Sequence, residues 1–198
     1  MALESSLDPA RTAVLSMDLQ AAIVRIYTGE HEQSLIARAA DLLLRCRERS
    51  IAVIHIQVGF RPGLPEINPR NALFAAIRNS PERQKVFEGD AGRIHPALGP
   101  AGDDIVITKH RVSAFTGTDL EMILRAKGID TLLLFGIATS GVVLSTLLDA
   151  FDADYRVIVV GDCCADTDAE VHRVLLERFF PRRGTVLTVA DLIRDLAG

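Results

Sequence analysis

Apolar and polar residues recur along this chain with two different periods. Six short runs rich in apolar and β-branched residues have the length of buried strands. They are 12–17, 51–57, 104–108, 132–135, 155–160 and 185–189. Apolar side chains at helical spacing, with charges on the opposite face, lie between several of them, in 31–49, 71–79, 118–128, after 142 and in 191–196. This alternation predicts a three-layer α/β/α fold with a six-stranded, mainly parallel sheet covered by helices on both faces.

The stretch 131–150, TLLLFGIATSGVVLSTLLDA, predicts where function resides. Its strand stops at Gly136, and uncharged residues lead from there into an apolar helix that contains Val142. Such a tight turn places backbone N–H groups and the positive end of a helix at the carboxyl edge of the sheet, where α/β proteins bind ligands. Asp18 and Lys109 follow two other predicted strands. We therefore expect three separate stretches to meet in one crevice.

Length, composition and charge narrow the class of protein. The chain has 198 residues, of which 48% are hydrophobic, and this suits one core and a single domain over 1–198. The net charge of −4 comes from interspersed charges, so nucleic acid is not an expected partner. No apolar stretch approaches membrane-spanning length and the polar N-terminus does not resemble a signal peptide. We expect a cytoplasmic protein with no membrane partner.

The cysteines favour the same compartment. Cys46, Cys163 and Cys164 are an odd number, lack metal-ligand spacing and suit a reducing cytosol. Cys46 lies on the apolar stripe of a predicted helix, which indicates a buried structural thiol. Cys163 and Cys164 are the two thiols near the predicted functional edge. There is no phosphate loop or G-x-G-x-x-G fingerprint, so no nucleotide cofactor is expected.

Three motifs resemble those of the isochorismatase-like hydrolases, also called the cysteine hydrolase superfamily. Residues 136–150, GIATSGVVLSTLLDA, resemble the nicotinamidase pattern G-x-A-T-x-x-C-V-x-x-T-x-x-D-A. Asp18-Leu19-Gln20 resembles D-x-Q, and residues 109–115, KHRVSAF, resemble K-x-x-x-S-A-F. The resemblance covers about 10–190. It implies the strand order 3-2-1-4-5-6, a non-proline cis peptide at Ile137–Ala138 and a homodimer or homotetramer.

One position departs from this resemblance. Val142 stands where the superfamily's cysteine hydrolases have their nucleophile, and an alkyl side chain cannot attack a carbonyl. The resemblance implies that Asp18 and Lys109 form a catalytic acid–base pair. It also implies a substrate pocket for a small molecule, lined by Gln20, Phe115, Ile137, Ala138 and Gly141. Some relatives bind a metal after the second strand, but 58–68 has no His and no close carboxylate pair, so we expect no catalytic metal.

Three functions follow as alternatives. The first is a hydrolase of a small metabolite that uses Asp18 and Lys109 without a nucleophile, as the resemblance implies for isochorismatases, which protonate a vinyl ether. The second is an inactive relative that binds a small carbonyl or carboxylate ligand or serves in assembly. The third is an amidase with Cys163 or Cys164 as a displaced nucleophile. The order of Asp18 and Lys109 in the chain favours the first.

Overall fold

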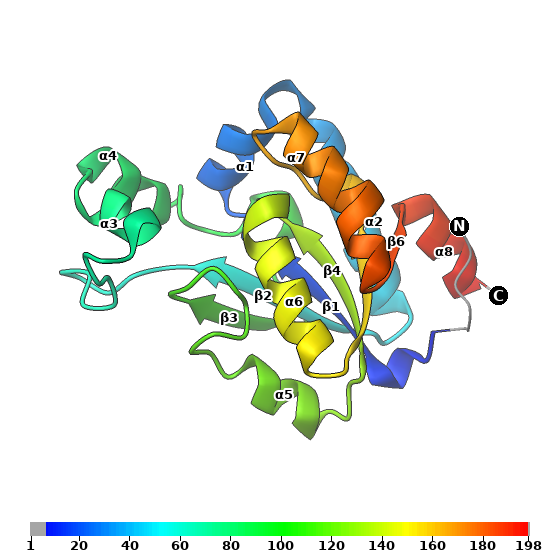
Figure 1. The fold of residues 1–198 in the computed structure, drawn as a ribbon. Helices are drawn as coiled ribbons and strands as arrows, with labels where there is room; N and C mark the ends of the chain where they lie inside the picture. The colour runs from blue at the N-terminus through cyan, green and yellow to red at the C-terminus, as the bar shows by residue number, and fades with distance from the viewer. Residues whose placement is uncertain (1–6, 198) are drawn as a thin grey trace.

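The computed structural model describes residues 7–197 and contains a six-stranded parallel sheet (Figure 1). Its strands are β1 (Thr12–Met17), β2 (Ala52–Val58), β3 (Ile105–Lys109), β4 (Thr131–Gly136), β5 (Arg156–Val160) and β6 (Thr185–Leu187). Their order is β3-β2-β1-β4-β5-β6, and every pairing is parallel. The predicted α/β fold and strand order are confirmed. Residues 1–6 and 198 of the predicted domain lie outside the described residues.

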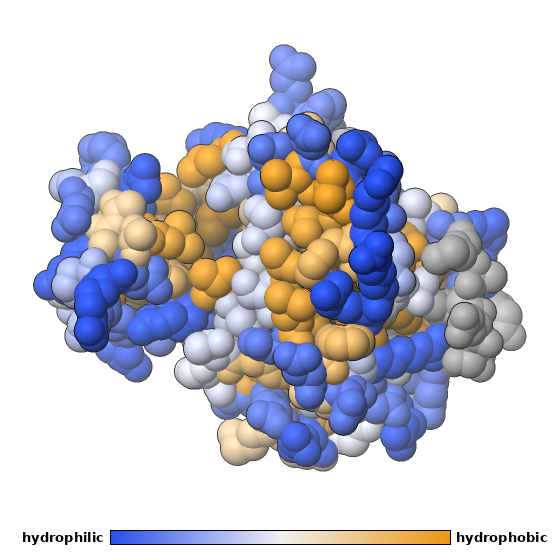
Figure 2. All heavy atoms as spheres, viewed as in Figure 1, coloured by the Kyte–Doolittle hydropathy of each residue, from blue (hydrophilic) through white to orange (hydrophobic). Residues whose placement is uncertain are grey.

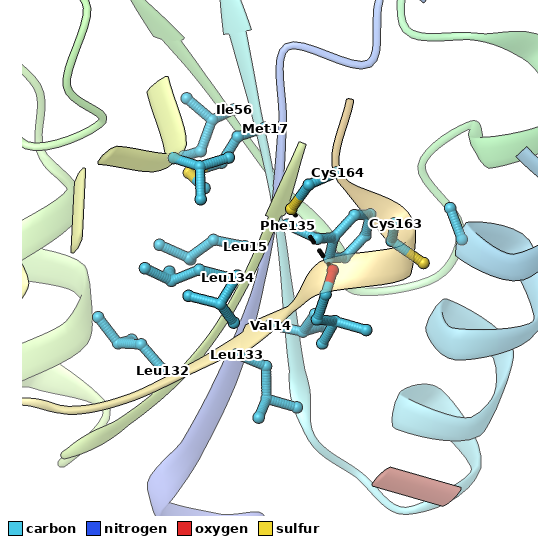
Figure 3. Packing of buried hydrophobic residues seen from close by; sticks show 14 of the residues in the cluster. Val14, Leu15, Met17, Ile56, Leu132, Leu133, Leu134, Phe135, Cys163 and Cys164 are labelled. Carbon is cyan, nitrogen blue, oxygen red and sulfur yellow. Dashed lines mark hydrogen bonds between the residues drawn. The ribbon is translucent and has the colours of Figure 1, made fainter. Parts of the chain in front are cut away.

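The two central strands form the middle of the core. Every residue of β1 and β4 is buried, and neither strand contains a charged side chain. In Figure 3, Leu132 and Leu134 point to one side of the sheet while Leu133 and Phe135 point to the other. A strand covered by helices on both faces needs such a continuous apolar run. This requirement explains why both strands could be found from the sequence.

Helices cover both faces of the sheet. On one side lie α1 (Ala21–Thr28), α2 (Glu32–Glu48) and α8 (Val189–Ala197), with α2 packed against β2, α1 and α8. Right-handed crossovers place α5 (Leu120–Ala126), α6 (Leu144–Asp152) and α7 (Ala169–Val174) on the other side (Figure 1). The sequence pattern did not predict α1, which is short and rich in β-branched residues. No helix within 7–197 is long and apolar enough to cross a membrane.

The segment between β2 and β3 stands out from the three layers. It carries α3 (Ala72–Arg78) and α4 (Pro81–Gln84), which project away from the sheet at the left of Figure 1. This segment has a small apolar cluster of its own, made by Ile67, Phe74 and Ile77. Phe60 packs against that cluster and also against the main core. The projecting segment is therefore tied to the body through side chains that lie beside the carboxyl edge of the sheet.

Candidate active site

Asp18 and Lys109 form a buried ion pair at the carboxyl edge of the sheet. Asp18 directly follows β1, and Lys109 is the last residue of β3. The Lys109 Nζ lies 2.8 Å from Asp18 Oδ2, and the two side chains are 2% and 9% exposed. Nζ also donates to the carbonyl oxygen of Arg111 at 3.0 Å. The structure therefore brings the two predicted catalytic residues together across the end of β2, which lies between their strands.

The backbone around Asp18 is fixed by both neighbouring strands. The residue has a positive φ of 55°, a conformation that Asp adopts more readily than most residues. Its N–H donates to the carbonyl oxygen of Ile56 at 2.8 Å. On the other side, the Ile137 N–H donates to the carbonyl oxygen of Met17 at 3.2 Å. The carboxyl group is thus held where β2 and β4 both approach the end of β1.

A cavity of about 200 Å³ lies over the ion pair. Asp18, Lys109, Ile137, Ala138, Gly141 and Val142 line its inner side. Its outer walls come from α1, with Ile23, Ile26 and Tyr27, and from α3, with Leu73, Phe74 and Ile77. Figure 2 shows hydrophobic residues in the hollow between the projecting segment and the body. Because pockets that bind drug-sized ligands have volumes of roughly 300–1,000 Å³, this smaller cavity suits a smaller molecule. The peptide bond Ile137–Ala138 in its wall is cis, at the position where the resemblance implies such a bond.

The two oxygens of the Asp18 carboxyl group have different surroundings. Oδ2 is held by Lys109, whereas Oδ1 is buried and no group within residues 7–197 forms a hydrogen bond with it. Burial raises the pKa of Asp18 above its ordinary value of 3.8, and the ammonium group of Lys109 opposes part of that rise. Burial therefore favours the protonated form of the Asp18 carboxyl group, and Oδ1 is the oxygen that no described group binds.

Comparison with known proteins identifies the family to which this arrangement belongs. A family model described as the isochorismatase domain matches residues 12–191. The chain belongs to the isochorismatase family. It is 31% identical over 191 residues to the isochorismatase family protein YecD of Escherichia coli O157:H7, with 96% of this chain and 98% of YecD covered. The maleamate amidohydrolase of Pseudomonas putida is 29% identical over 162 residues, with 81% of this chain and 74% of that enzyme covered.

A solved structure agrees with the sequence comparison. An isochorismatase family protein from Burkholderia thailandensis superimposes with a TM-score of 0.82 and 31% sequence identity, with 98% of each chain covered. Isochorismatase family members are hydrolases, so the hydrolase class expected from the motifs is confirmed at this coarse level.

Within this isochorismatase-family fold, Val142 occupies the cavity wall. It follows a kink at Gly141, where ψ is −105°, in the wide helical turn Thr139–Val143 that connects β4 to α6. Val142 as a whole is 2% exposed. It thus lines the same cavity as the ion pair, at the position where the motif resemblance places a nucleophilic thiol, and offers only an alkyl surface.

The native thiols lie elsewhere. Cys163 and Cys164 are both buried and neither lines the cavity. Cys164 Sγ donates to the carbonyl oxygen of Val160 at 3.4 Å (Figure 3), and burial raises its pKa to about 12. Burial also raises the pKa of Cys163, and that of Cys46 to about 12. These positions give no support to a displaced cysteine nucleophile, because thiols become reactive as thiolates.

Alkylation tests this interpretation. Iodoacetamide at neutral pH should label the native protein slowly, with mass spectrometry finding all three thiols largely unmodified while the fold is intact. A Ser34→Cys variant provides the positive control, since Ser34 is exposed and a thiol there would be open to the reagent. Rapid labelling of Cys163 or Cys164 in the native protein would contradict the burial argument.

Other positions of the family motifs hold the loop that follows Lys109. Ser113 Oγ donates to Asp149 Oδ2 at 2.5 Å, and the Ala114 N–H donates to Thr146 Oγ1 at 3.0 Å. Both acceptors belong to α6. The chain after Lys109 is therefore fastened to the helix that follows the Val142 turn. Ser113 and Ala114 therefore have a structural role here. They join the motif that begins at Lys109 to the motif that contains Val142 through direct hydrogen bonds.

Removing one of these contacts should weaken the fold modestly. Ser113→Ala is expected to lower the free energy of unfolding by about 1–2 kcal/mol, because a hydrogen bond to a carboxylate is lost in a partly buried place. Thermal or urea unfolding measures the change. Ser34→Ala is the matched control, since the exposed Ser34 Oγ donates only to the carbonyl oxygen of His31 within α2's first turn. Equal stability of the two variants would contradict the fastening role.

Two expected pocket residues, Gln20 and Phe115, are not among the residues lining the cavity. Gln20 is fully buried, and its Nε2 donates to the carbonyl oxygens of Val58 at 3.0 Å and Gly92 at 2.6 Å. Its Oε1 accepts from the Val58 N–H at 2.8 Å. Phe115 packs against Tyr155 with ring centroids 6.0 Å apart. Gln20 thus joins the end of β2 to the long connecting segment, and Phe115 contributes to packing; in this structure neither lines the cavity.

Several other residues that line the cavity were not predicted from the sequence. Tyr27 and Arg111 bring polar groups to the cavity wall, and the apolar residues of α1 and α3 close its sides. Of these residues, only Arg111 could have been predicted from the sequence. It lies two residues after Lys109, the last residue of β3, and alternate residues of an extended chain point to the same side. Within residues 7–197, no three or more His, Cys, Asp or Glu side chains are grouped to hold a metal ion.

Proposed function

We propose that this isochorismatase-family protein hydrolyses a small metabolite by proton transfer from Asp18, with Lys109 as its partner and without a covalent enzyme intermediate. The observation that carries the proposal is the environment of the Asp18 carboxyl group. Lys109 holds one oxygen at 2.8 Å, while the other is buried in the cavity wall without a hydrogen-bond partner in the described chain. A buried acid in the wall of a small cavity, with one oxygen that no described group binds, suits general acid catalysis.

A vinyl ether is the favoured substrate class. Transfer of the Oδ1 proton to the terminal vinyl carbon would convert the ether carbon into an oxocarbenium ion and leave Asp18 as a carboxylate. Water then adds its oxygen to that carbon and gives a proton to the carboxylate. The resulting hemiketal releases the alcohol, so the sum is vinyl ether plus water to ketone plus alcohol. No step needs a thiol, and none uses Val142.

Lys109 would serve Asp18 in two ways. Its ammonium group stabilises the carboxylate that remains after the proton leaves, which offsets part of the cost of a buried negative charge. Its position at Oδ2 also leaves Oδ1 as the oxygen that no described group of the protein binds. Burial and the ion pair therefore act on the pKa of Asp18 in opposite directions, as a proton donor that must also be regenerated requires.

Amides are the alternative substrate class, because one relative is named a maleamate amidohydrolase. Amide hydrolysis through an acyl-enzyme needs a nucleophile beside the acid–base pair, and Val142 offers none. Direct attack by water on an amide does not have the benefit of a covalent acyl-enzyme intermediate, which splits one difficult step into two easier ones. We therefore expect amides to be hydrolysed much more slowly than vinyl ethers.

A substrate panel tests the proposal. It should contain vinyl ethers such as isochorismate, together with nicotinamide and other small amides, each followed by chromatographic detection of the products. The expected result is a higher kcat/KM for a vinyl ether. The Val142→Cys variant is the matched control, because a thiol in the cavity should shift the preference toward amides. Faster amide turnover by the native protein would overturn the choice of substrate class.

The assembly expected from the resemblance belongs to the same proposal. A homodimer or homotetramer should appear as a single species of two or four chains in sedimentation experiments at micromolar concentration. A monomer under those conditions would remove this part of the proposal without affecting the assignment of Asp18.

A further inference from the structure

The charged residues that line the cavity do not balance. Within the described chain they are Asp18, Lys109 and Arg111. Asp18 and Lys109 form an ion pair, which leaves the guanidinium group of Arg111 as an excess positive charge. When Asp18 carries a proton, as the proposed function requires, the excess grows by one. A small cavity with a net positive charge and otherwise mainly apolar walls favours an anionic ligand with an apolar body.

The contacts of Arg111 leave its charge uncompensated. Nη1 donates to the carbonyl oxygen of His110 at 2.6 Å, and Nη2 donates to the carbonyl oxygen of Glu66 at 3.0 Å. Both acceptors are neutral, and no carboxylate of residues 7–197 lies within 4.0 Å of the guanidinium group. The Glu66 carboxylate is bound by Arg61 instead. Arginine has five N–H donors, so most remain for a ligand.

The position of the guanidinium group also suits a ligand. Its Cζ lies 5.6 Å from the centroid of the Phe74 ring, and Phe74 forms part of the outer cavity wall. The two hydrogen bonds to backbone carbonyl oxygens fix the plane of the guanidinium group. This reduces the conformational entropy that the Arg111 side chain loses when a ligand binds. Arginine in a fixed orientation matches the two oxygens of a carboxylate.

We propose that Arg111 binds a carboxylate group of the substrate, whose apolar part lies between Phe74 on α3 and Ile23 and Ile26 on α1. The bond to be cleaved then lies toward Asp18, on the inner side of the cavity. This inference rests on the proposed function in taking the cavity as the substrate site. It goes beyond that function by naming the charge of the substrate and the residue that recognises it.

A purely structural role for Arg111 predicts different behaviour. Its bonds to His110 and Glu66 join the projecting segment to the chain after β3. If that were its whole contribution, replacing it would weaken the binding of neutral and anionic ligands alike. Recognition of a carboxylate instead predicts a loss confined to anionic ligands.

Benzoate and benzamide provide a matched pair of probes, since they share a planar ring and differ in charge. Calorimetry or ligand-observed NMR should find that the native protein binds benzoate roughly tenfold to a hundredfold more tightly than benzamide. Arg111→Gln should abolish this preference while leaving the Kd of benzamide within about twofold. Arg111→Lys should retain part of it, because the charge remains and the planar fork is lost.

Arg78→Gln is the matched control. Arg78 Nη1 also donates to a backbone carbonyl of the projecting segment, that of Ile67 at 3.0 Å, but Arg78 does not line this cavity. This variant should keep the preference for benzoate. No preference in the native protein, or an equal loss of both probes in Arg111→Gln, would overturn the inference.

The two proposals fail in separable ways, because probe binding requires no turnover. An unchanged kcat in Asp18→Asn would overturn the acid role and leave the benzoate preference, which supports the inference about Arg111. A full loss of kcat in Asp18→Asn, combined with equal binding of the two probes by the native protein, would overturn the carboxylate inference alone.

Discussion

Asp18→Asn is expected to lower kcat by roughly a hundredfold to ten-thousandfold, with a much smaller change in KM. Asn keeps the size of Asp and also tolerates the positive φ of 55° at this position, so the backbone should be retained. The substitution removes the proton that Oδ1 would deliver. Steady-state kinetics on the best substrate of the panel measures both constants, and circular dichroism checks the fold.

The pH profile should identify the direction of proton transfer. Burial raises the pKa of Asp18 above 3.8, so the protonated form persists to higher pH than in an exposed carboxyl group. If that form is the active one, kcat/KM should fall as pH rises through the raised pKa. A carboxylate acting as a base would give a rise over the same range. The Asn variant should lose this limb of the profile.

Asp154→Asn is the matched control for this experiment. Asp154 is an exposed residue that also has a positive φ, of 63°, and does not line the cavity. It should retain native kcat and the native pH profile. If no member of the panel is turned over, while a ligand binds equally well to the native and Asp18→Asn proteins, the inactive binding-protein alternative becomes the better account.

The sequence predicted those parts of the fold that depend on local pattern. The sequence places the first strand at 12–17, in agreement with β1. Its bounds can be predicted because the run has no charged residue and is flanked by charged residues, so the whole run can be buried and its neighbours cannot. The last strand was extended to 189, whereas β6 ends at Leu187 and Val189 already begins α8. The apolar residues of 185–189 belong partly to β6 and partly to α8. The apolar pattern of so short a run therefore does not show where the strand ends and the helix begins.

The same contrast holds at the site. Asp18 and Lys109 could be placed together because parallel strands all end at one edge, which makes their meeting a consequence of topology. Gln20 could not be placed, because its amide bonds to the backbone of Val58 and Gly92, which come from distant parts of the chain. The helix in 71–79 could be predicted from its periodic pattern, but the outer wall of the cavity also depends on how the projecting segment packs against the body, and that long-range packing leaves no periodic signal.

Gly136→Ala should have the largest effect on stability. Gly136 has a φ of 148°, and a Cβ atom there would lie 2.1 Å from the carbonyl oxygen of Met17. That oxygen belongs to β1 and accepts from the Ile137 N–H, so it cannot move away without loss of the β1–β4 contact. Backbone strain and steric overlap together are expected to lower the free energy of unfolding by about 3–5 kcal/mol.

The effect should extend to catalysis, because Met17 directly precedes Asp18. Any displacement that admits the new methyl group also moves Asp18, so kcat should fall even in the folded fraction. Thermal unfolding should show a melting temperature lower by roughly 6–20 °C for a chain of this size. Gly99→Ala is the matched control, since its φ of −47° is accessible to alanine and its Cβ would lie 3.4 Å from the nearest atom. Equal melting temperatures for the two variants would show that the close approach of β4 to Met17 is not what positions Asp18.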